Sequence, residues 1–298
     1  MNPKKWTIGE LLRVTAEYLE AKGIESPRLS SEILLAHNLG VDRIHLFLNF
    51  DKPLDEEEIT RYRTLVRRRV KGEPIQYITG RQDFWSMEFI VGPGVLIPRP
   101  ESELLVETAL SLLGKRPGTP GESATILDLG TGSGALAVAL ARELEGAEIW
   151  ATDISGPALE VARENARRHG LEGRIHFREG DLFGAFGKED IEFHVVLSNP
   201  PYIPSGTFTS LQPEIRDHEP RVALDGGPDG MDCIERIIRE GAGFLKSGGW
   251  LLLEMGPGQM SRARQLVQAN GHYRDNRAVK DYSHQFRVLI AKKKLSQE

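Results

Sequence analysis

From residue 125 onward the chain alternates between short apolar runs and longer amphipathic segments, and this alternation constrains the fold more than any other feature. The short runs predict β-strands and the longer segments predict helices. Apolar strands that alternate with helices predict a doubly wound, Rossmann-like α/β fold, with a mainly parallel seven-stranded sheet covered on both faces. The expected strands are 125–129, 148–152, 174–178, 195–198, 250–255, 287–291 and, from a weaker pattern, 273–278, and the expected helices are 134–144, 157–169, 230–245 and 258–269.

Residues 1–73 show a different pattern, because their apolar residues recur at helical spacing. A Thr-x-x-Glu capping box at Thr7 starts one expected helix. The clearest helix runs from Asp55 to about Val70, with acidic residues in its first turn and three arginines, 67–69, near its end. The arginine cluster is interpreted as a solvated helix end, with a contact to a negatively charged partner as the alternative.

The stretch after the helices changes character again. Short β-like runs at 76–78, 84–85 and 88–91 are separated by glycines, which predicts a hairpin linker. The chain is therefore expected to contain a helical domain, 1–73, a linker, 74–97, and an α/β domain, 98–298.

Composition and charge argue against several classes of protein. The chain has 298 residues, of which 40% are hydrophobic and 27% charged, and its net charge is −5, so it has no overall basic character that would indicate direct binding to nucleic acid. Its single cysteine, Cys233, cannot form an intramolecular disulfide and fits a reducing compartment. No apolar run approaches the ~18 residues of a membrane span, and the start of the chain lacks the apolar core of a signal peptide. We expect a cytoplasmic protein that does not associate with membranes.

A glycine-rich loop, Asp-Leu-Gly-Thr-Gly-Ser-Gly at 128–134, follows the first expected strand of the sheet and opens a helix. Its glycines let the backbone approach a ligand closely, and the helix start offers free N–H groups. Gly130, Gly132 and Ala135 satisfy the G-x-G-x-x-G/A fingerprint of dinucleotide-binding folds, and Asp153 lies at about the spacing of a ribose-binding acid. The loop alone is therefore compatible with an NAD site or with an S-adenosylmethionine (SAM) site.

Polar residues stand at four expected strand ends, namely Asp128, Asp153, Asp181 and Asn199. In an open α/β sheet, ligands bind at the carboxyl ends of the strands. Four polar side chains at that edge indicate a nucleoside ligand.

Asn199 begins an Asn-Pro-Pro-Tyr tetrapeptide directly after the strand 195–198. Its two prolines donate no backbone N–H and fix φ near −65°, so they end the strand and leave the carbonyls of Asn199 and Pro200 without a partner in the sheet. Because a chain seldom leaves such acceptors bare, we expect a donor-rich group, an NH₂, to bind them.

The tetrapeptide combined with the glycine loop resembles class I SAM-dependent methyltransferases that act on exocyclic or amide nitrogen. These include adenine-N6 DNA methyltransferases, guanine-N2 rRNA methyltransferases and the release factor glutamine methyltransferases (the PrmC/HemK family). Features across essentially the whole chain resemble the last group: the helical N-terminal domain and the segments 72–80, 95–103, 199–204, 219–230 and 253–256.

This resemblance implies an enzyme that transfers a methyl group from SAM to the side-chain amide nitrogen (N5) of the glutamine in the Gly-Gly-Gln motif of peptide chain release factors. The N-terminal helices would recognise that partner, and the segment 203–228 is interpreted as a substrate-side loop. The Asn199 side-chain oxygen and the Pro200 carbonyl would hold the amide NH₂, Tyr202 would pack against the amide plane, and Pro201 would lie at the substrate.

The resemblance also implies the cofactor contacts. The expected residues are Gly130, Thr131, Gly132, Ser133, Gly134, Asp153, Asp181, Leu182 and Asn199. Leu182 departs from the pattern, because some members carry an aromatic residue there. The segment 98–103 would close the pocket, with an ion pair between Arg99 and Glu101 or Glu103 as the alternative role of the arginine.

Three other functions stay open on sequence alone. A nucleic-acid amino-methyltransferase shares the tetrapeptide but needs a basic face or a target-recognition insert, and base flipping for duplex DNA. An NAD-dependent oxidoreductase shares the glycine loop but leaves the tetrapeptide unexplained. A non-catalytic SAM-binding adaptor would not need the intact tetrapeptide.

No metal site is expected, because His218-Glu219-Pro220 lacks the H-E-x-x-H spacing. We also expect a monomer.

Overall fold

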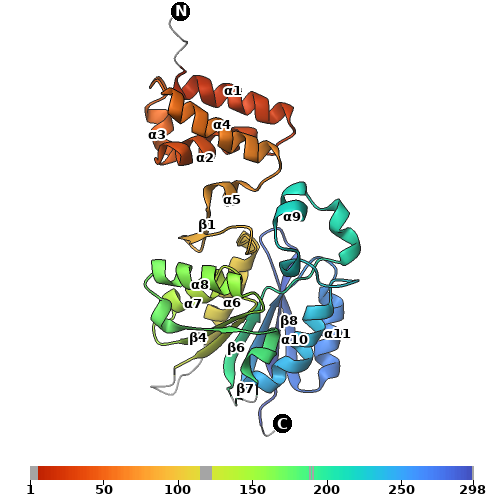
Figure 1. Ribbon diagram of the computed structural model, residues 1–298. Helices are drawn as coiled ribbons and strands as arrows, with labels where there is room; N and C mark the ends of the chain where they lie inside the picture. The colour runs from red at the N-terminus through yellow and green to blue at the C-terminus, as the bar shows by residue number, and fades with distance from the viewer. Residues whose placement is uncertain (1–5, 115–122, 188, 190, 297–298) are drawn as a thin grey trace, which may run out of the picture. The chain divides into compact units, whose positions relative to one another are not determined.

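The computed structural model describes residues 6–114, 123–187, 189 and 191–296. The chain divides into two compact units, one helical and one α/β (Figure 1). The helical unit comprises Met1–Arg81 and Gln212–His218, and the α/β unit comprises Gln82–Leu211 and Glu219–Glu298.

The N-terminal helices form because apolar faces recur along them and local caps satisfy their free N–H groups. Capping boxes at Thr7 and Asp55 start the first and fourth helices, as the sequence predicts for Thr7. The apolar faces converge on one core, where the buried Tyr62 donates its hydroxyl to the Ser31 carbonyl at 3.1 Å. The helices of this unit are α1 (Ile8–Ala21), α2 (Pro27–Leu39), α3 (Arg43–Leu48), α4 (Glu56–Val70), α5 (Ile75–Thr79) and α9 (Pro213–His218).

The β-like interpretation of residues 76–78 is wrong, because these residues lie in helix α5. Aromatic and β-branched residues favour strands, but here they occupy a single helical turn. Pro74 stands at its N-cap and Gly80, with a φ of 75°, at its C-cap. These two residues were the available sequence signal for a short helix.

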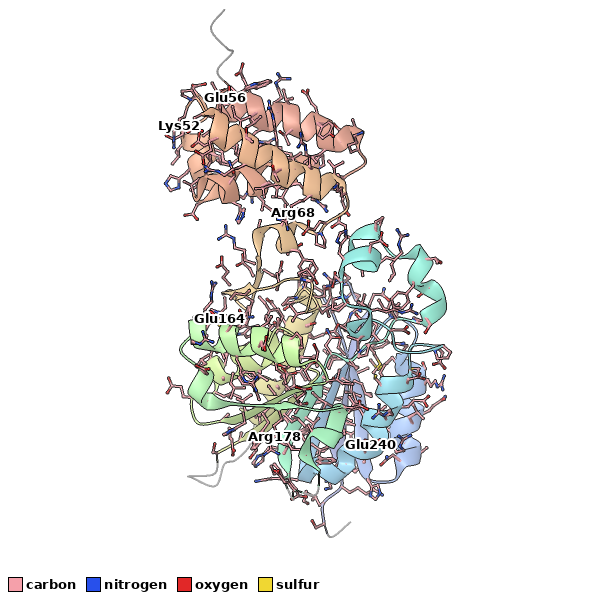
Figure 2. The ribbon with its side chains drawn as sticks, in the orientation of Figure 1. Lys52, Glu56, Arg68, Glu164, Arg178 and Glu240 are labelled. Carbon is pink, nitrogen blue, oxygen red and sulfur yellow. The ribbon has the colours of Figure 1, made fainter. Side chains whose placement is uncertain are left out.

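The interpretation of the arginine cluster as a solvated helix end is wrong for Arg69, whereas the side chain of Arg68 is 41% exposed and also forms an ion pair. Arg69 is only 4% exposed, and it donates to Glu214 of α9 at 2.6 Å and to the Glu73 carbonyl at 3.1 Å. Arg68, at the C-terminal end of α4 in Figure 2, donates to both carboxylate oxygens of Glu73 at 2.5 and 2.8 Å. Arg67 is exposed, as expected.

The α/β unit confirms the expected seven-stranded sheet, whose strand order is β5-β4-β3-β6-β7-β9-β8. The first five of these strands pair in parallel, and β9 pairs antiparallel with both β7 and β8. The strands are β3 (Thr125–Leu129), β4 (Glu148–Asp153), β5 (Ile175–Glu179), β6 (Phe193–Ser198), β7 (Leu245–Glu254), β8 (Tyr273–Lys280) and β9 (Phe286–Lys293).

Two hydrophobic cores lie on opposite faces of this sheet, because successive strand residues point to opposite sides. Ile126 and Val195 belong to the core under α6, α7 and α8, whereas Leu127 and Val196 belong to the core under α10 and α11 (Figure 1). The helices are α6 (Glu103–Leu113), α7 (Ala135–Glu143), α8 (Gly156–Arg168), α10 (Asp232–Gly241) and α11 (Met260–Asn270), with the short 3-10 helices η1 (Pro100–Ser102), η2 (Glu172–Arg174), η3 (Leu182–Phe186), η4 (Ser205–Ser210), η5 (Arg221–Ala223) and η6 (Ala242–Phe244).

The expected hairpin is present as β1 (Arg81–Phe84) and β2 (Met87–Ile90). Trp85 and Ser86 form its two-residue turn, with positive φ angles of 52° and 54°. Glu103 of α6 accepts a hydrogen bond from the Trp85 backbone N–H at 2.7 Å, which fixes the hairpin turn to α6.

The segment 203–228 is more ordered than the predicted loop. It contains η4, α9 and η5. Pro204 and Pro220 are N-caps of the two 3-10 helices, and Pro213 is the first residue of α9. A proline presets the backbone for a helix start, so the prolines that suggested a loop also begin these short helices.

Candidate active site

One pocket in the α/β unit gathers most of the predicted site residues. It lies at the carboxyl ends of β3, β4 and β6, as expected for an open α/β sheet. The predicted residues that line it are Gly130, Thr131, Gly132, Ser133, Asp153, Asp181, Leu182, Asn199 and Pro201. Gly134, Pro200 and Tyr202 lie next to this set in the chain but are not part of the pocket lining.

The glycine loop is fixed to the end of β4 by its own backbone. The N–H groups of Gly130 and Thr131 both donate to the Thr152 carbonyl at 2.8 Å, and Gly132 donates to Asp153 Oδ2 at 2.8 Å. Among the described residues, apart from the chain neighbours, no atom lies within 4 Å of the positions that a Cβ would occupy at Gly130 and Gly132. The loop therefore leaves open space above its backbone for part of a ligand.

Gly134 has a structural reason to be glycine. Its φ is +82°, and a Cβ there would lie 3.0 Å from Ala162 Cβ and 3.1 Å from Ala162 Cα on α8. Helix α7 begins at the next residue, so this contact sets how closely the loop and α7 approach α8.

Replacing Gly134 with alanine is expected to lower the free energy of unfolding by about 2–4 kcal/mol, because the left-handed backbone and the contact with Ala162 are both unfavourable for a side chain. Urea denaturation measures the change. Gly173→Ala is the matched control, since its φ is not positive and no atom lies within 4 Å of its Cβ position. Equal losses of unfolding free energy in the two variants would show that the contact with Ala162 does not account for the loss.

Asp128 accepts hydrogen bonds from the glycine loop and from helix α7. It is fully buried, and its Oδ2 accepts from the Thr131 hydroxyl at 2.6 Å and from the Ala137 N–H at 3.2 Å. Burial raises the pKa of Asp128 to about 7, against the opposing hydrogen bonds. The expectation that all four strand-end polar residues face a ligand is therefore wrong for Asp128, because the loop residues cover it.

Asp153 lines the pocket, and its carboxylate can accept hydrogen bonds from hydroxyl groups. Its Oδ2 accepts from Gly132 and its Oδ1 from the Ser155 N–H at 2.9 Å. Burial raises the pKa of this carboxyl. Each carboxylate oxygen has a second lone pair, so both can accept a further hydrogen bond.

Asp181 and Leu182 form another part of the pocket wall. Asp181 receives two hydrogen bonds from Arg236 of α10, at 2.9 and 3.2 Å, a partner that the sequence did not indicate. Leu182 has a φ of +50°, which is uncommon for a residue other than glycine, and it packs beside the core under α10 and α11.

Asn199 is held by residues from two distant segments. Its Nδ2 donates to the Ser102 hydroxyl oxygen at 3.0 Å, and that hydroxyl donates to Glu254 Oε2 at 2.6 Å. Tyr202 donates its hydroxyl to Glu254 Oε1 at 3.4 Å. Among the residues that the structure describes, no group donates to Asn199 Oδ1 or to the Pro200 carbonyl. The two acceptors that the family resemblance implies, Asn199 Oδ1 and the Pro200 carbonyl, are thus free among the described residues.

Ser102 and Glu254 were missed as functional candidates. Both lie within segments that carry the family resemblance, but they are 152 residues apart and nothing local pairs them. Glu254 is buried, and burial raises its pKa to about 7.

Tyr202 is oriented by several contacts in its surroundings. Its hydroxyl points to Glu254, and its carbonyl accepts from Gln259 Nε2 at 2.9 Å. Burial raises the pKa of Tyr202, so the phenol stays protonated at neutral pH. That this ring packs against a substrate amide stays a prediction.

The alternative role of Arg99, an ion pair with Glu101 or Glu103, is wrong. Arg99 pairs with Glu219, whose side chain is only 1% exposed and whose other oxygen accepts from the Ile97 N–H at 3.4 Å. This pair joins two stretches of the pocket wall, around Pro98 and Pro220. A buried carboxylate must be paired or hydrogen-bonded, as Glu219 is, whereas Glu101 is exposed and can remain solvated.

Comparisons with known proteins cover nearly the whole chain. The family model described as the PrmC N-terminal domain matches residues 10–80, and the methyltransferase small domain matches residues 102–213. The release factor glutamine methyltransferase of Geobacter sulfurreducens is 47% identical over 269 residues, which cover 90% of this chain and 91% of that protein. The protein of the same description from Rhodopirellula baltica is 40% identical over 293 residues, covering 98% of both chains.

The chain belongs to the release factor glutamine methyltransferase family. Its fold agrees with this, because the N-terminal domain of human METTL16, solved in complex with SAH, superposes with a TM-score of 0.52 at 17% identity, over 83% of this chain and 86% of that one. As a member of this family, the chain is a class I methyltransferase with SAM as its methyl donor.

The pocket residues fit SAM. The open space above Gly130 and Gly132 and the spare lone pairs of Asp153 match a ligand with a slender chain and ribose hydroxyls.

In the part of the chain that the structure describes, no helix combines the length and apolar character needed to cross a membrane.

Proposed function

We propose that this chain methylates the side-chain amide nitrogen (N5) of the glutamine in the Gly-Gly-Gln motif of peptide chain release factors. The observation that carries the proposal is the pair of free acceptors, Asn199 Oδ1 and the Pro200 carbonyl, next to the glycine-loop pocket. The names of the curated relatives support the same substrate. The intact tetrapeptide argues against a non-catalytic adaptor and against an oxidoreductase.

The proposed cofactor contacts are made by residues that line the pocket or adjoin it in the chain. The loop Gly130, Thr131, Gly132, Ser133 and Gly134 lies along the methionine part of SAM, and Asp153 accepts the ribose hydroxyls. Asp181 and Leu182 flank the adenine, with Asp181 oriented by Arg236. When bound, SAM supplies an electrophilic methyl group on its sulfonium.

The chemistry asked of the chain is to make an amide nitrogen react. That nitrogen is a poor nucleophile, because its lone pair is delocalised into the carbonyl. Asn199 Oδ1 and the Pro200 carbonyl each accept one N–H of the amide and so orient the nitrogen. Orientation of this kind can supply ~7–11 kcal/mol of a barrier. The same acceptors stabilise the positive charge that develops on the nitrogen, which then loses its proton readily.

Further features of the proposal concern the whole protein. The helical part, 1–73, recognises the release factor, and 74–97 links it to the methyltransferase domain, 98–298. Pro201 lies at the substrate, and its position in the pocket lining supports this part of the proposal. The chain acts as a cytoplasmic monomer, without direct contact with nucleic acid, which fits its net charge of −5.

A parallel labelling experiment tests the function. The purified chain is incubated with methyl-labelled SAM and one of three acceptors: a release factor, the same factor with Gln→Glu in its Gly-Gly-Gln motif, or duplex DNA. The expected result is label on the unaltered release factor alone. Label on DNA and none on the release factor would contradict the proposal and favour a nucleic-acid amino-methyltransferase.

A further inference from the structure

A chain of hydrogen bonds runs from the pocket into the core of the α/β unit. It starts at Asn199 after β6, passes through Ser102 at the end of η1 and ends at Glu254, the last residue of β7. Ser102 and Glu254 are both buried. Side chains from three separate segments are therefore joined, and two of them, Asn199 and Ser102, also line the pocket.

The direction of these bonds determines which atom Asn199 presents to the pocket. An ionised carboxylate has no proton to donate, so Glu254 can only accept. The single hydroxyl proton of Ser102 therefore goes to Glu254, and the Ser102 oxygen must accept from Asn199. The amide NH₂ of Asn199 then faces Ser102, and its Oδ1 is left for the substrate.

Protonation of Glu254 permits the opposite direction. A neutral carboxylic acid can donate to the Ser102 oxygen, which frees the Ser102 proton to donate to Asn199 Oδ1. The amide of Asn199 then turns its own NH₂ towards the pocket. An NH₂ group cannot accept a hydrogen bond from the NH₂ of a substrate amide, so this arrangement opposes binding in the reactive orientation.

We propose that Ser102 and Glu254 are positioning residues that fix the orientation of the Asn199 amide, and that the enzyme is active when Glu254 is ionised. The proposal rests on the proposed function, in which a substrate amide NH₂ binds Asn199. Neither residue needs to touch the substrate amide, because both act through Asn199.

The surroundings of Glu254 raise the pKa of its carboxyl to about neutral pH. Besides Ser102, the groups that face Glu254 are Tyr202, Arg287 and Glu101. Burial raises its pKa to about 7, while the Ser102 hydrogen bond and the Arg287 charge act against the rise. Because the ionised form is the active one, kcat is expected to increase as pH rises through about 7.

The wild-type pH profile alone does not assign this step, because the pKa of the buried Asp128 also lies at about 7. The Glu254→Gln variant separates the two, since it retains the side-chain shape and Asp128 but cannot ionise. We expect this variant to lose the step near pH 7 and to turn over more slowly than the wild type at pH 8.

Ser102→Ala breaks the chain of bonds at its centre. At pH 8 its kcat is expected to fall roughly tenfold, from the loss of the hydrogen bond that holds Asn199, while the Kd for SAM from calorimetry changes by less than about twofold. Unchanged SAM binding also shows that the variant is folded. The matched control is Ser111→Ala, an exposed position on α6 that should leave both constants unchanged.

A second readout needs no substrate. The side-chain amide ¹⁵N and proton resonances of Asn199, followed by NMR in the protein alone, are expected to shift with pH with a midpoint near 7. The shift should be absent in Glu254→Gln and in Ser102→Ala.

The outcomes separate this inference from the proposed function. Wild-type kcat in Ser102→Ala, or an unaltered pH step in Glu254→Gln, would overturn the positioning role. If the wild type leaves the release factor unmethylated, the proposed function fails, and the Asn199 titration still decides whether Glu254 controls the amide.

Discussion

Replacing Asn199 with alanine is expected to lower kcat for glutamine methylation about 10³-fold, while the Kd for SAM changes by less than about threefold. The variant removes one of the two free acceptors beside the pocket and with it the orientation of the substrate amide. The Pro200 carbonyl remains, because it belongs to the backbone. Single-turnover kinetics with a release factor measure the chemical step, and calorimetry measures SAM binding.

The control for this variant is Asn276→Ala on the edge strand β8, outside the pocket lining. It should keep wild-type turnover. If Asn199→Ala also kept turnover near that of the wild type, the orientation of the amide by Asn199 would be ruled out as the source of catalysis.

Replacing Asp153 with alanine is expected to weaken SAM binding about 10²-fold or more. Two hydrogen bonds from ribose hydroxyls to a carboxylate are worth about 1.5–3 kcal/mol each. The substitution also removes the acceptors of the Gly132 and Ser155 N–H groups, so the glycine loop loses one of its three hydrogen bonds to the end of β4. Isothermal titration calorimetry gives the Kd directly.

Asp153→Asn and Asp275→Ala complete this comparison. The asparagine retains one acceptor oxygen and should show an intermediate loss of affinity. Asp275 is exposed on β8 and its removal should have no effect. An unchanged Kd in Asp153→Ala would remove Asp153 from the cofactor site.

The two expectations depend on different parts of the pocket and can fail independently. In the proposed function, Asn199 acts on the substrate amide, whereas Asp153 acts on the cofactor. A variant set in which SAM affinity and turnover fell together at both positions would indicate that the pocket as a whole had lost its structure. Urea denaturation of the same variants checks this directly.

Several features of the site follow from the sequence alone, because the interactions behind them are local. The alternation of apolar runs and amphipathic segments gives the layered sheet, since it depends on the spacing of neighbouring residues. The glycine loop between β3 and α7 and the prolines after β6 act on their own backbone. The position of Gly130, Gly132 and Asn199 in the pocket lining could therefore be anticipated.

Propensity alone misjudged the segments in which two local signals compete. Residues 76–78 carry strand-favouring side chains between a proline and a glycine, and the caps determined the outcome as α5. The segment 203–228 has the prolines and glycines of a loop, but its prolines begin short helices.

What only the tertiary structure decided is the pairing of charged and polar side chains over long distances in the chain. Arg99 finds Glu219 and not Glu101 or Glu103, and Ser102 finds Glu254. In the sequence these carboxylates look alike, because burial is what distinguishes them. A buried carboxylate must be paired or hydrogen-bonded, and burial exists only once the strands and loops have assembled. The sequence alone thus identified most of the groups that line the pocket, and the assembled fold determined which buried residues hydrogen-bond to them.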